Sequence, residues 1–280
     1  DRLAAALSLP EPQAVPRPLV LLIHGLTGSE DSLNIRQSAA HLLGLGYPVL
    51  RLNLRGAGPS RPLCRFRYHA GRSEDFAGAL AALPRPLVTA GIVAVGFSLG
   101  ANMLLKYLGE RGADVPLQAA VAVSTPIDLQ AAALGIMRPR NALYQTYLLG
   151  NLKREALAKG AELDAAARRA ITAARTIWEF DDDFVAPANG FAGAEDYYAR
   201  NSSEQFLDRI GIATLVIYAQ DDPWIPSAAY LAHDWQRNSR LVPLLPPHGG
   251  HVGFQGRYNR GVPWHDLCIA QFLASVSADR

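Results

Sequence analysis

Residues 92–100 read Ile-Val-Ala-Val-Gly-Phe-Ser-Leu-Gly, so that an apolar run leads directly into the pattern G-x-S-x-G. The apolar run predicts a buried β-strand. A helix is expected to follow, because apolar side chains then recur at helical spacing at Leu99, Met103, Leu104, Tyr107 and Leu108. A strand, a sharp turn and a helix in succession place Ser98 on a strained turn that needs glycine on either side. The alternative is an ordinary turn in which the serine only caps the helix.

Outward from this stretch, short apolar runs alternate with longer helix-like segments. Such alternation predicts an α/β fold with a mostly parallel central sheet and helices on both faces. The expected strands are Leu19–Ile23, Pro48–Leu52, Ile92–Phe97, Leu117–Val123, Ala213–Ala219 and Leu241–Leu245. The expected helices are Ile35–Leu45, Ser73–Leu83, Leu99–Leu108, Ala228–Trp235 and Trp264–Val276.

The alternation stops between about Asp128 and Gln205, where no run resembles a buried strand and helix-prone segments such as Ala165–Arg175 dominate. We therefore expect a core of residues 1–128 and 206–280, with residues 129–205 as a helical cap insert placed over the strand ends. The opening stretch carries Pro10, Pro12, Pro16 and Pro18, and it is expected to be an extended arm.

The composition is that of an ordinary globular protein, with 49% hydrophobic and 19% charged residues in a chain of 280. A formal net charge of +2 without a basic cluster argues against nucleic-acid binding. The segment Leu3–Leu9 is too short to span a membrane. Cys64 and Cys268 lie far apart and outside any C-x-x-C motif, which favours a reducing, cytoplasmic setting but leaves a disulfide open.

A serine nucleophile needs a base, and the base needs an acid that orients it. The expected strand Ala213–Ala219 is followed by Asp221-Asp222-Pro223, and the last expected strand is followed by His248-Gly249-Gly250-His251. The order Ser, Asp, His along the chain is that of α/β-hydrolases. We favour Asp222 over Asp221 because a D-P-x-x-P turn follows it, and His251 over His248 because Gly250 precedes it. A metal site built from these four side chains is the alternative, but it lacks a third strong ligand in a fixed local pattern.

Acyl transfer also needs N–H donors for the negative charge that develops on the carbonyl oxygen. The glycine-rich stretch His24-Gly25-Leu26-Thr27-Gly28 follows the first expected strand. We expect the backbone N–H groups of Leu26 and Leu99 to form this oxyanion hole. His24 is expected to hold the loop, not to transfer protons.

These motifs together resemble the YheT-like, embryogenesis-associated branch of the α/β-hydrolases. The resemblance covers nearly the whole chain and implies Ser98, Asp222 and His251 as the triad, with carboxylic esters as substrates and acylglycerols or phospholipids among those of some relatives. Two positions depart from the usual pattern: Ala101 replaces a frequent glycine, and Asn53 replaces a frequent aspartate. Neither change is expected to affect the chemistry. The likeness is carried by His24–Ser29, Asn53–Gly56, Gly96–Leu105, Asp181–Phe191, Tyr197-Tyr198, Asp221–Pro223 and His248–Phe254.

The expected function is that of a serine esterase or lipase acting through an acyl-enzyme, with no cofactor or metal and with a small-molecule ester or lipid ester as substrate. Peripheral membrane contact through the insert is compatible with this. The alternatives are a non-catalytic binding protein of the same fold, or a thioesterase or acyltransferase that uses the same residues. Aromatic residues of the insert could line an acyl pocket or only dock the insert on the core; they are Phe180, Phe184, Phe191, Tyr197 and Tyr198.

Overall fold

The computed structural model of the chain describes residues 1–11, 15–158, 162–256 and 261–278. A seven-stranded sheet with the order β1-β3-β2-β4-β5-β6-β7 forms its centre. All neighbouring strands are parallel except β1, which pairs antiparallel with β3. The strands are β1 (Ala5–Ser8), β2 (Leu19–Ile23), β3 (Val49–Leu52), β4 (Ile92–Phe97), β5 (Ala119–Val123), β6 (Ala213–Ile217) and β7 (Leu241–Leu244). The expected mostly parallel α/β sheet is therefore confirmed.

Strand β1 corrects one expectation. The opening stretch is not only an extended arm, because Ala5–Ser8 adds an edge strand against Val49–Leu52. An edge strand of four residues bonds through its backbone and leaves little apolar pattern, so its composition does not reveal it. Pro12, which contributed to that expectation, lies outside the described residues.

Helices cover both faces of the sheet, as expected. Alternate strand residues point to opposite faces, and in β2 Leu19, Leu21 and Ile23 belong to one buried cluster while Val20 and Leu22 belong to another. The first cluster includes α2 (Glu74–Ala81) and α3 (Leu99–Arg111), and the second includes α1 (Leu33–Gly44) and α11 (Trp264–Ala278). The remaining elements of the core are α10 (Ala228–Ala232) and the short 3-10 helices η1 (Gly58–Leu63), η2 (Arg85–Leu87), η5 (Ser203–Arg209) and η6 (Trp235–Arg237).

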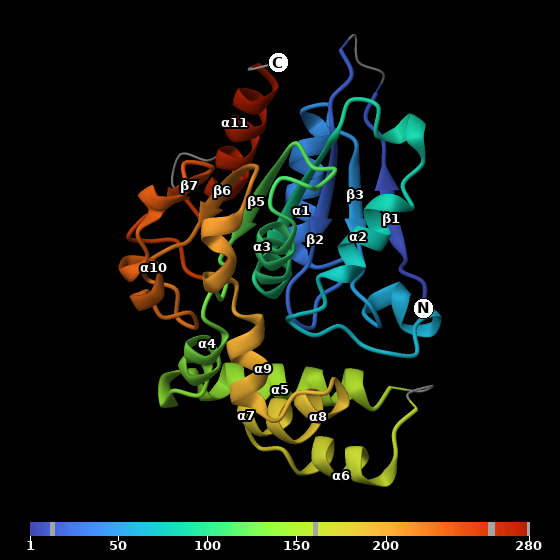
Figure 1. Cartoon of the computed structure of the whole chain (residues 1–280), viewed down its shortest axis with the longest axis vertical. Helices are drawn as coiled ribbons and strands as arrows, with labels where there is room; N and C mark the ends of the chain where they lie inside the picture. The colour runs from blue at the N-terminus through green and yellow to red at the C-terminus, as the bar shows by residue number, and fades with distance from the viewer. Residues whose placement is uncertain (12–14, 159–161, 257–260, 279–280) are drawn as a thin grey trace.

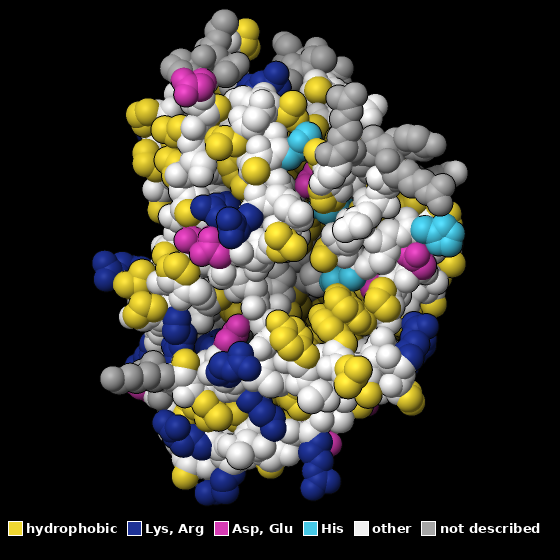
Figure 2. All heavy atoms as spheres, turned by 180° about the vertical axis from the view of Figure 1, so that it is seen from behind, with side chains coloured by type: hydrophobic (Ala, Val, Ile, Leu, Met, Phe, Trp, Pro, Cys, Tyr) yellow, Lys and Arg dark blue, Asp and Glu magenta, His cyan; other side chains and the backbone are white. Residues whose placement is uncertain are grey.

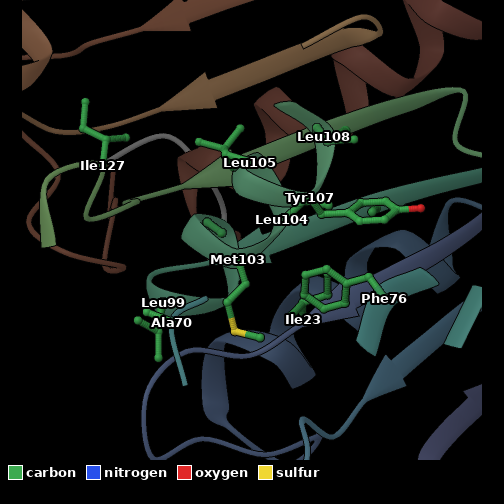
Figure 3. Close-up of a cluster of buried hydrophobic side chains, with 14 of the residues drawn as sticks. Ile23, Ala70, Phe76, Leu99, Met103, Leu104, Leu105, Tyr107, Leu108 and Ile127 are labelled. Carbon is green, nitrogen blue, oxygen red and sulfur yellow. The ribbon is translucent and has the colours of Figure 1, made fainter. Parts of the chain in front are cut away.

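Helix α3 lies at the centre of the molecule. Figure 3 shows its side chains, among them Met103, Leu104 and Leu108, packed with Ile23 of β2 and Phe76 of α2. All the apolar positions predicted for this helix are buried. Ala101, which replaces a frequent glycine, is fully buried. A helix so enclosed holds its first turn, and with it Ser98, rigidly in place.

Between β5 and β6 the described residues form helices and no strand (Figure 1). These helices gather at the end of the molecule opposite the C-terminus, where α5, α6 and α7 enclose a separate buried cluster that includes Leu149, Ile171 and Phe180. The elements are α4 (Leu129–Ile136), η3 (Pro139–Asn141), α5 (Ala142–Ala156), α6 (Ala165–Ala173), α7 (Ile177–Phe180), the π-helical turn η4 (Asp181–Val185), α8 (Ala186–Ala188) and α9 (Ala194–Asn201).

Two smaller points follow from the packing. Cys64 and Cys268 are both free, which answers the disulfide question that the sequence left open. Among the described residues, no helix combines the length and the apolar character needed to cross a bilayer.

Candidate active site

Ser98 occupies the sharp turn between β4 and α3. Its backbone has φ 52° and ψ −122°, a conformation that costs energy for a residue with a side chain. The two flanking glycines are required by space: a Cβ on Gly96 would lie 2.7 Å from the Cα of Ala101, and one on Gly100 would lie 2.3 Å from the carbonyl oxygen of His24. The backbone N–H of Ser98 donates to the carbonyl of Val123 at 2.8 Å, which ties the turn to β5. The predicted strand-turn-helix is therefore present.

His251 and Asp222 meet Ser98 from the far end of the chain. The Nε2 atom of His251 lies 2.9 Å from the Oγ of Ser98, and its Nδ1 lies 2.7 Å from the Oδ2 of Asp222. The Asp222 side chain is fully buried, and its Oδ1 accepts hydrogen bonds from the N–H groups of Trp224 and Ile225 at 2.9 and 3.1 Å. Both oxygens of the acid are thus used, one to hold the turn and one to orient the imidazole.

Asp221 and His248 form a second, more exposed pair. The Oδ1 of Asp221 accepts from the N–H groups of Gly249 and Gly250 at 2.9 and 2.8 Å, and its Oδ2 lies 3.2 Å from the Nδ1 of His248. Partial burial raises the pKa of Asp221, but these hydrogen bonds outweigh it and the pKa is lowered overall. Asp221 therefore braces the loop that carries His251. The four side chains separate into two pairs, and no group of three potential metal ligands occurs among the residues the structure describes.

Ser124, which the sequence did not single out, also holds the histidine loop. It follows β5 directly, has φ 51°, and donates a hydrogen bond from its hydroxyl to the backbone carbonyl of His251. A polar residue at the carboxyl end of a central parallel strand was the available signal. Trp224 is a second addition, because its ring packs against the imidazole of His251 at 4.5 Å and stacks on Tyr144 of α5 at 3.6 Å.

The glycine-rich loop after β2 lies against the nucleophile, since a Cβ on Gly25 would be 3.0 Å from the Cβ of Ser98. His24 holds this loop as expected. Its Nδ1 lies 2.8 Å from the Gly25 carbonyl, and its Nε2 accepts the N–H of Leu54 at 3.1 Å. The imidazole is therefore a neutral tautomer that carries its proton on Nδ1. Burial lowers the pKa of His24 to about 4, so it stays neutral at physiological pH.

Leu26 and Leu99 both border the cavity that opens at Ser98. Leu99 is the first residue of α3, where a backbone N–H has no partner within its own helix. Next to Leu26, Thr27 has φ 55°, and its N–H donates to the hydroxyl of Tyr68 at 2.7 Å. Tyr68 is buried and was not predicted from the sequence, but it fixes the orientation of the peptide beside Leu26.

The cavity has a volume of about 780 Å³, within the range of small-molecule sites. Figure 2 shows the molecule from behind, with hydrophobic side chains gathered beside a hollow near the middle of the face in view. Of the five aromatic residues considered in the sequence, Phe180, Phe184, Tyr197 and Tyr198 border the cavity. Phe191 does not, because it packs behind Tyr197 with ring centroids 5.2 Å apart.

Asn53, which replaces a frequent aspartate, has a structural role. Its Oδ1 accepts the N–H of Glu30 at 2.9 Å, and its Nδ2 donates to the carbonyl of Ala4 at 3.2 Å. It therefore connects the loop after β2 to the residue that precedes strand β1, and it does not line the cavity.

Comparison with known proteins agrees with this architecture. The model of the α/β hydrolase fold family matches residues 18–255. YheT of Escherichia coli (strain K12), whose name provisionally assigns it as an esterase, is 35% identical over 252 residues, which are 87% of this chain and 72% of YheT. The embryogenesis-associated protein EMB8 of Picea glauca is 28% identical over 272 residues, covering 92% of this chain and 58% of its own.

Among solved structures, the Pyrococcus furiosus esterase Pf2001 superposes with a TM-score of 0.63 over 93% of this chain and 82% of its own, at 17% identity. At that identity the likeness supports the fold alone. The matches with YheT and EMB8, together with the family model, support a closer statement. The chain belongs to the α/β-hydrolase fold family, in the branch that contains YheT and the embryogenesis-associated proteins.

Proposed function

We propose that this protein is a serine hydrolase that cleaves carboxylic esters. The observation that carries the proposal is the continuous pair of contacts from Ser98 to His251 to Asp222, at 2.9 and 2.7 Å, at the edge of a largely apolar cavity. A hydroxyl, a base and a buried acid in this arrangement are what nucleophilic acyl transfer requires. The esterase name of YheT supports the same reaction class.

In the first stage, the Oγ of Ser98 attacks the ester carbonyl carbon while the Nε2 of His251 takes the hydroxyl proton. The carbonyl oxygen becomes an oxyanion, which the N–H groups of Leu26 and Leu99 stabilise. The tetrahedral intermediate then releases the alcohol, which takes its proton from His251, and leaves an acyl group on Ser98. Asp222 stabilises the imidazolium of His251 between the uptake of the proton from Ser98 and its delivery to the alcohol.

In the second stage, water attacks the acyl group and gives its proton to His251. Collapse of this second intermediate returns the proton to Ser98 and releases the carboxylic acid. Every proton that is transferred in the cycle passes through His251, so no further acid or base is required.

Residues 129–205 act in this proposal as a cap over the site. Side chains from α4, α5, α7 and η4 border the same cavity as Ser98 and His251. The stack of Tyr144 on Trp224 connects the cap to the turn that carries Asp222. A substrate held between cap and strand ends is largely withdrawn from water, which strengthens the oxyanion contacts.

A fluorophosphonate probe and a series of p-nitrophenyl esters test the proposal. We expect one probe adduct per chain, located on the peptide that contains Ser98, and ester turnover that varies with acyl length. Ser98→Ala should abolish labelling and lower kcat by about 10⁴- to 10⁶-fold while the melting temperature stays close to that of the wild type. Turnover by Ser98→Ala at the wild-type rate would refute the assignment of the nucleophile.

A further inference from the structure

The cavity is lined by two chemically different sets of side chains. Helices α4 and α5 contribute aliphatic side chains, among them Leu129, Ile136 and Leu148. Hydroxyl and carboxyl groups border the same cavity, among them those of Tyr197, Tyr198 and Asp181. An acyl chain is itself apolar and gains by burial against the aliphatic side chains. The polar groups are then left for the other part of an ester, its alcohol.

Asp181 is the unusual member of these polar groups. It begins the π-helical turn η4, a type of distortion that occurs frequently at functional sites. Its Oδ2 accepts the hydroxyl proton of Tyr198 at 2.6 Å, and that tyrosine is almost fully buried. The carboxyl group lies deep in the protein yet keeps some accessible surface, because it borders the cavity.

Pairing with a cation does not explain the buried position of the Asp181 carboxyl group. Burial raises its pKa to about 7, the Tyr198 hydrogen bond offsets this only in part, and no cation contributes to the shift. A carboxyl group placed in such a setting is costly unless it is used. The hydroxyl of the nearby Tyr197 already has a protein partner, since it accepts the N–H of Ala70 at 2.8 Å.

The adjacent aspartates do not share this setting. The Oδ1 of Asp182 accepts the N–H of Ala194 at 2.7 Å and so supports the start of α9, whereas Asp183 borders the cavity but is exposed and accepts no hydrogen bond from a buried hydroxyl of the described residues. The relevant feature is therefore the single pair of Asp181 and Tyr198 inside the cavity, not the acidic run as a whole.

We propose that Asp181, held in place by Tyr198, binds a hydroxyl group on the alcohol portion of the ester and so selects esters of hydroxylated alcohols. This rests on the proposed esterase function. A hydroxyl is favoured over an ammonium group because a carboxyl with a pKa near 7 is partly protonated at neutral pH. It can accept a hydrogen bond from a hydroxyl when ionised and donate one when protonated, whereas an ammonium group requires the ionised form.

The test compares two octanoate esters of equal size, the 2-hydroxyethyl ester and the propyl ester, which differ by a hydroxyl in place of a methyl group. The first ratio is kcat/KM for the 2-hydroxyethyl ester divided by kcat/KM for the propyl ester. We expect Asp181→Leu to lower this ratio by about 10-fold, because the hydroxyl of the substrate loses its partner. Asp181→Asn should lower it by less than about 3-fold, since an amide can still accept and donate. The matched control is Asp114→Leu, at an exposed aspartate that does not line the cavity, and it should leave the ratio unchanged.

A second pair of esters separates hydroxyl from cation recognition. Octanoylcholine and 3,3-dimethylbutyl octanoate have the same shape, but only the first carries a charge. The second ratio is kcat/KM for octanoylcholine divided by kcat/KM for 3,3-dimethylbutyl octanoate. If Asp181→Leu and Asp181→Asn both lower the second ratio more than the first, the site binds cations and the proposal is wrong. An unchanged first ratio in Asp181→Leu, with ester turnover retained, also overturns it.

Should Asp181→Leu fail to fold, Tyr198→Phe provides the test, because it removes the donor that fixes the carboxyl and should lower the first ratio about 3-fold. A Tyr198→Phe ratio equal to that of the wild type would then count against the subsite. Failure of the wild type to cleave any of the four esters would instead count against the proposed function. The two failures are therefore distinguishable.

Discussion

At the scale of single residues, the site depends on which aspartate faces which histidine. The two candidate aspartates are adjacent in sequence and the two candidate histidines are close to each other, yet only the Asp222–His251 pair reaches Ser98. Asp221 and His248 face away, and the His248 side chain is 87% exposed. The difference predicts unequal effects of two conservative substitutions.

Asp222→Asn should lower kcat by about 10⁴-fold, because an amide favours the wrong tautomer of His251. Asp221→Asn should lower it by about 10-fold or less, since the loop loses charge-assisted hydrogen bonds but keeps an acceptor for the Gly249 and Gly250 N–H groups. Steady-state kinetics on a p-nitrophenyl ester give both values. The reverse order of effects would assign the acid to Asp221.

Tyr68 provides a prediction that the sequence alone did not offer. Tyr68→Phe leaves the N–H of Thr27 without its acceptor, so the peptide next to Leu26 should lose its fixed orientation. We expect kcat to fall about 10-fold while KM changes less than about 2-fold, because the oxyanion contact forms only in the transition state.

Tyr47→Phe is the control for Tyr68→Phe. Tyr47 is also buried, but its hydroxyl has no hydrogen-bond partner among the described residues. Its removal should therefore leave kcat unchanged. A large rise in KM in Tyr68→Phe would mean that Tyr68 contacts the substrate and does not act through the loop.

At the scale of elements, the turn between β4 and α3 tolerates no additional side chain. A Cβ on Gly100 would lie 2.3 Å from a backbone oxygen and 2.8 Å from a side-chain carbon of Ile23, whereas one on Gly150 in α5 would meet nothing within 4 Å. Both glycines are helical, so helix propensity alone would favour alanine at each.

Gly100→Ala should destabilise the fold by about 3 kcal/mol or more, because backbone must move to make room. Gly150→Ala should stabilise it by about 0.5–1 kcal/mol through the loss of backbone freedom in the unfolded chain. Urea denaturation followed by circular dichroism measures both. Equal effects on the free energy of unfolding would show that the turn is not closely packed.

The elements also show where sequence patterns succeed and fail. The central strands could be predicted because both faces of each are buried, which leaves a continuous apolar run such as Leu19–Ile23. Strand β1 could not, since an edge strand needs only backbone partners. The π-helical turn at Asp181–Val185 was not predicted either, because no residue pattern in the sequence marks a turn with one extra residue.

At the scale of the whole molecule, the free energy of unfolding should depend on pH through Asp181. Its pKa is about 7 in the folded state and 3.8 in the unfolded chain. Between these values the folded protein binds the proton more strongly, so this group lowers stability as pH rises from about 4 to 7. The penalty is absent below that window and complete above it.

Asp181→Asn removes the titrating group, so the stability advantage of the variant over the wild type should increase by about 2.6 kcal/mol from pH 5 to pH 8. Urea denaturation of both proteins at the two pH values checks this. If the difference between them were independent of pH, the Asp181 carboxyl would have to be solvated in the folded protein.

From the sequence by itself came the alternation of central strands and core helices, the turn at Ser98, and the expected residues of the triad and oxyanion hole. These are local patterns, because burial and sharp turns restrict which residue types can follow one another within a few positions. Only the tertiary structure decided that Ser124 holds the loop of His251 across 127 positions, that Tyr68 holds Thr27 across 41, and that Asp181 faces the cavity. Such contacts depend on how whole layers pack, and no spacing along the chain records the distance between two packed layers.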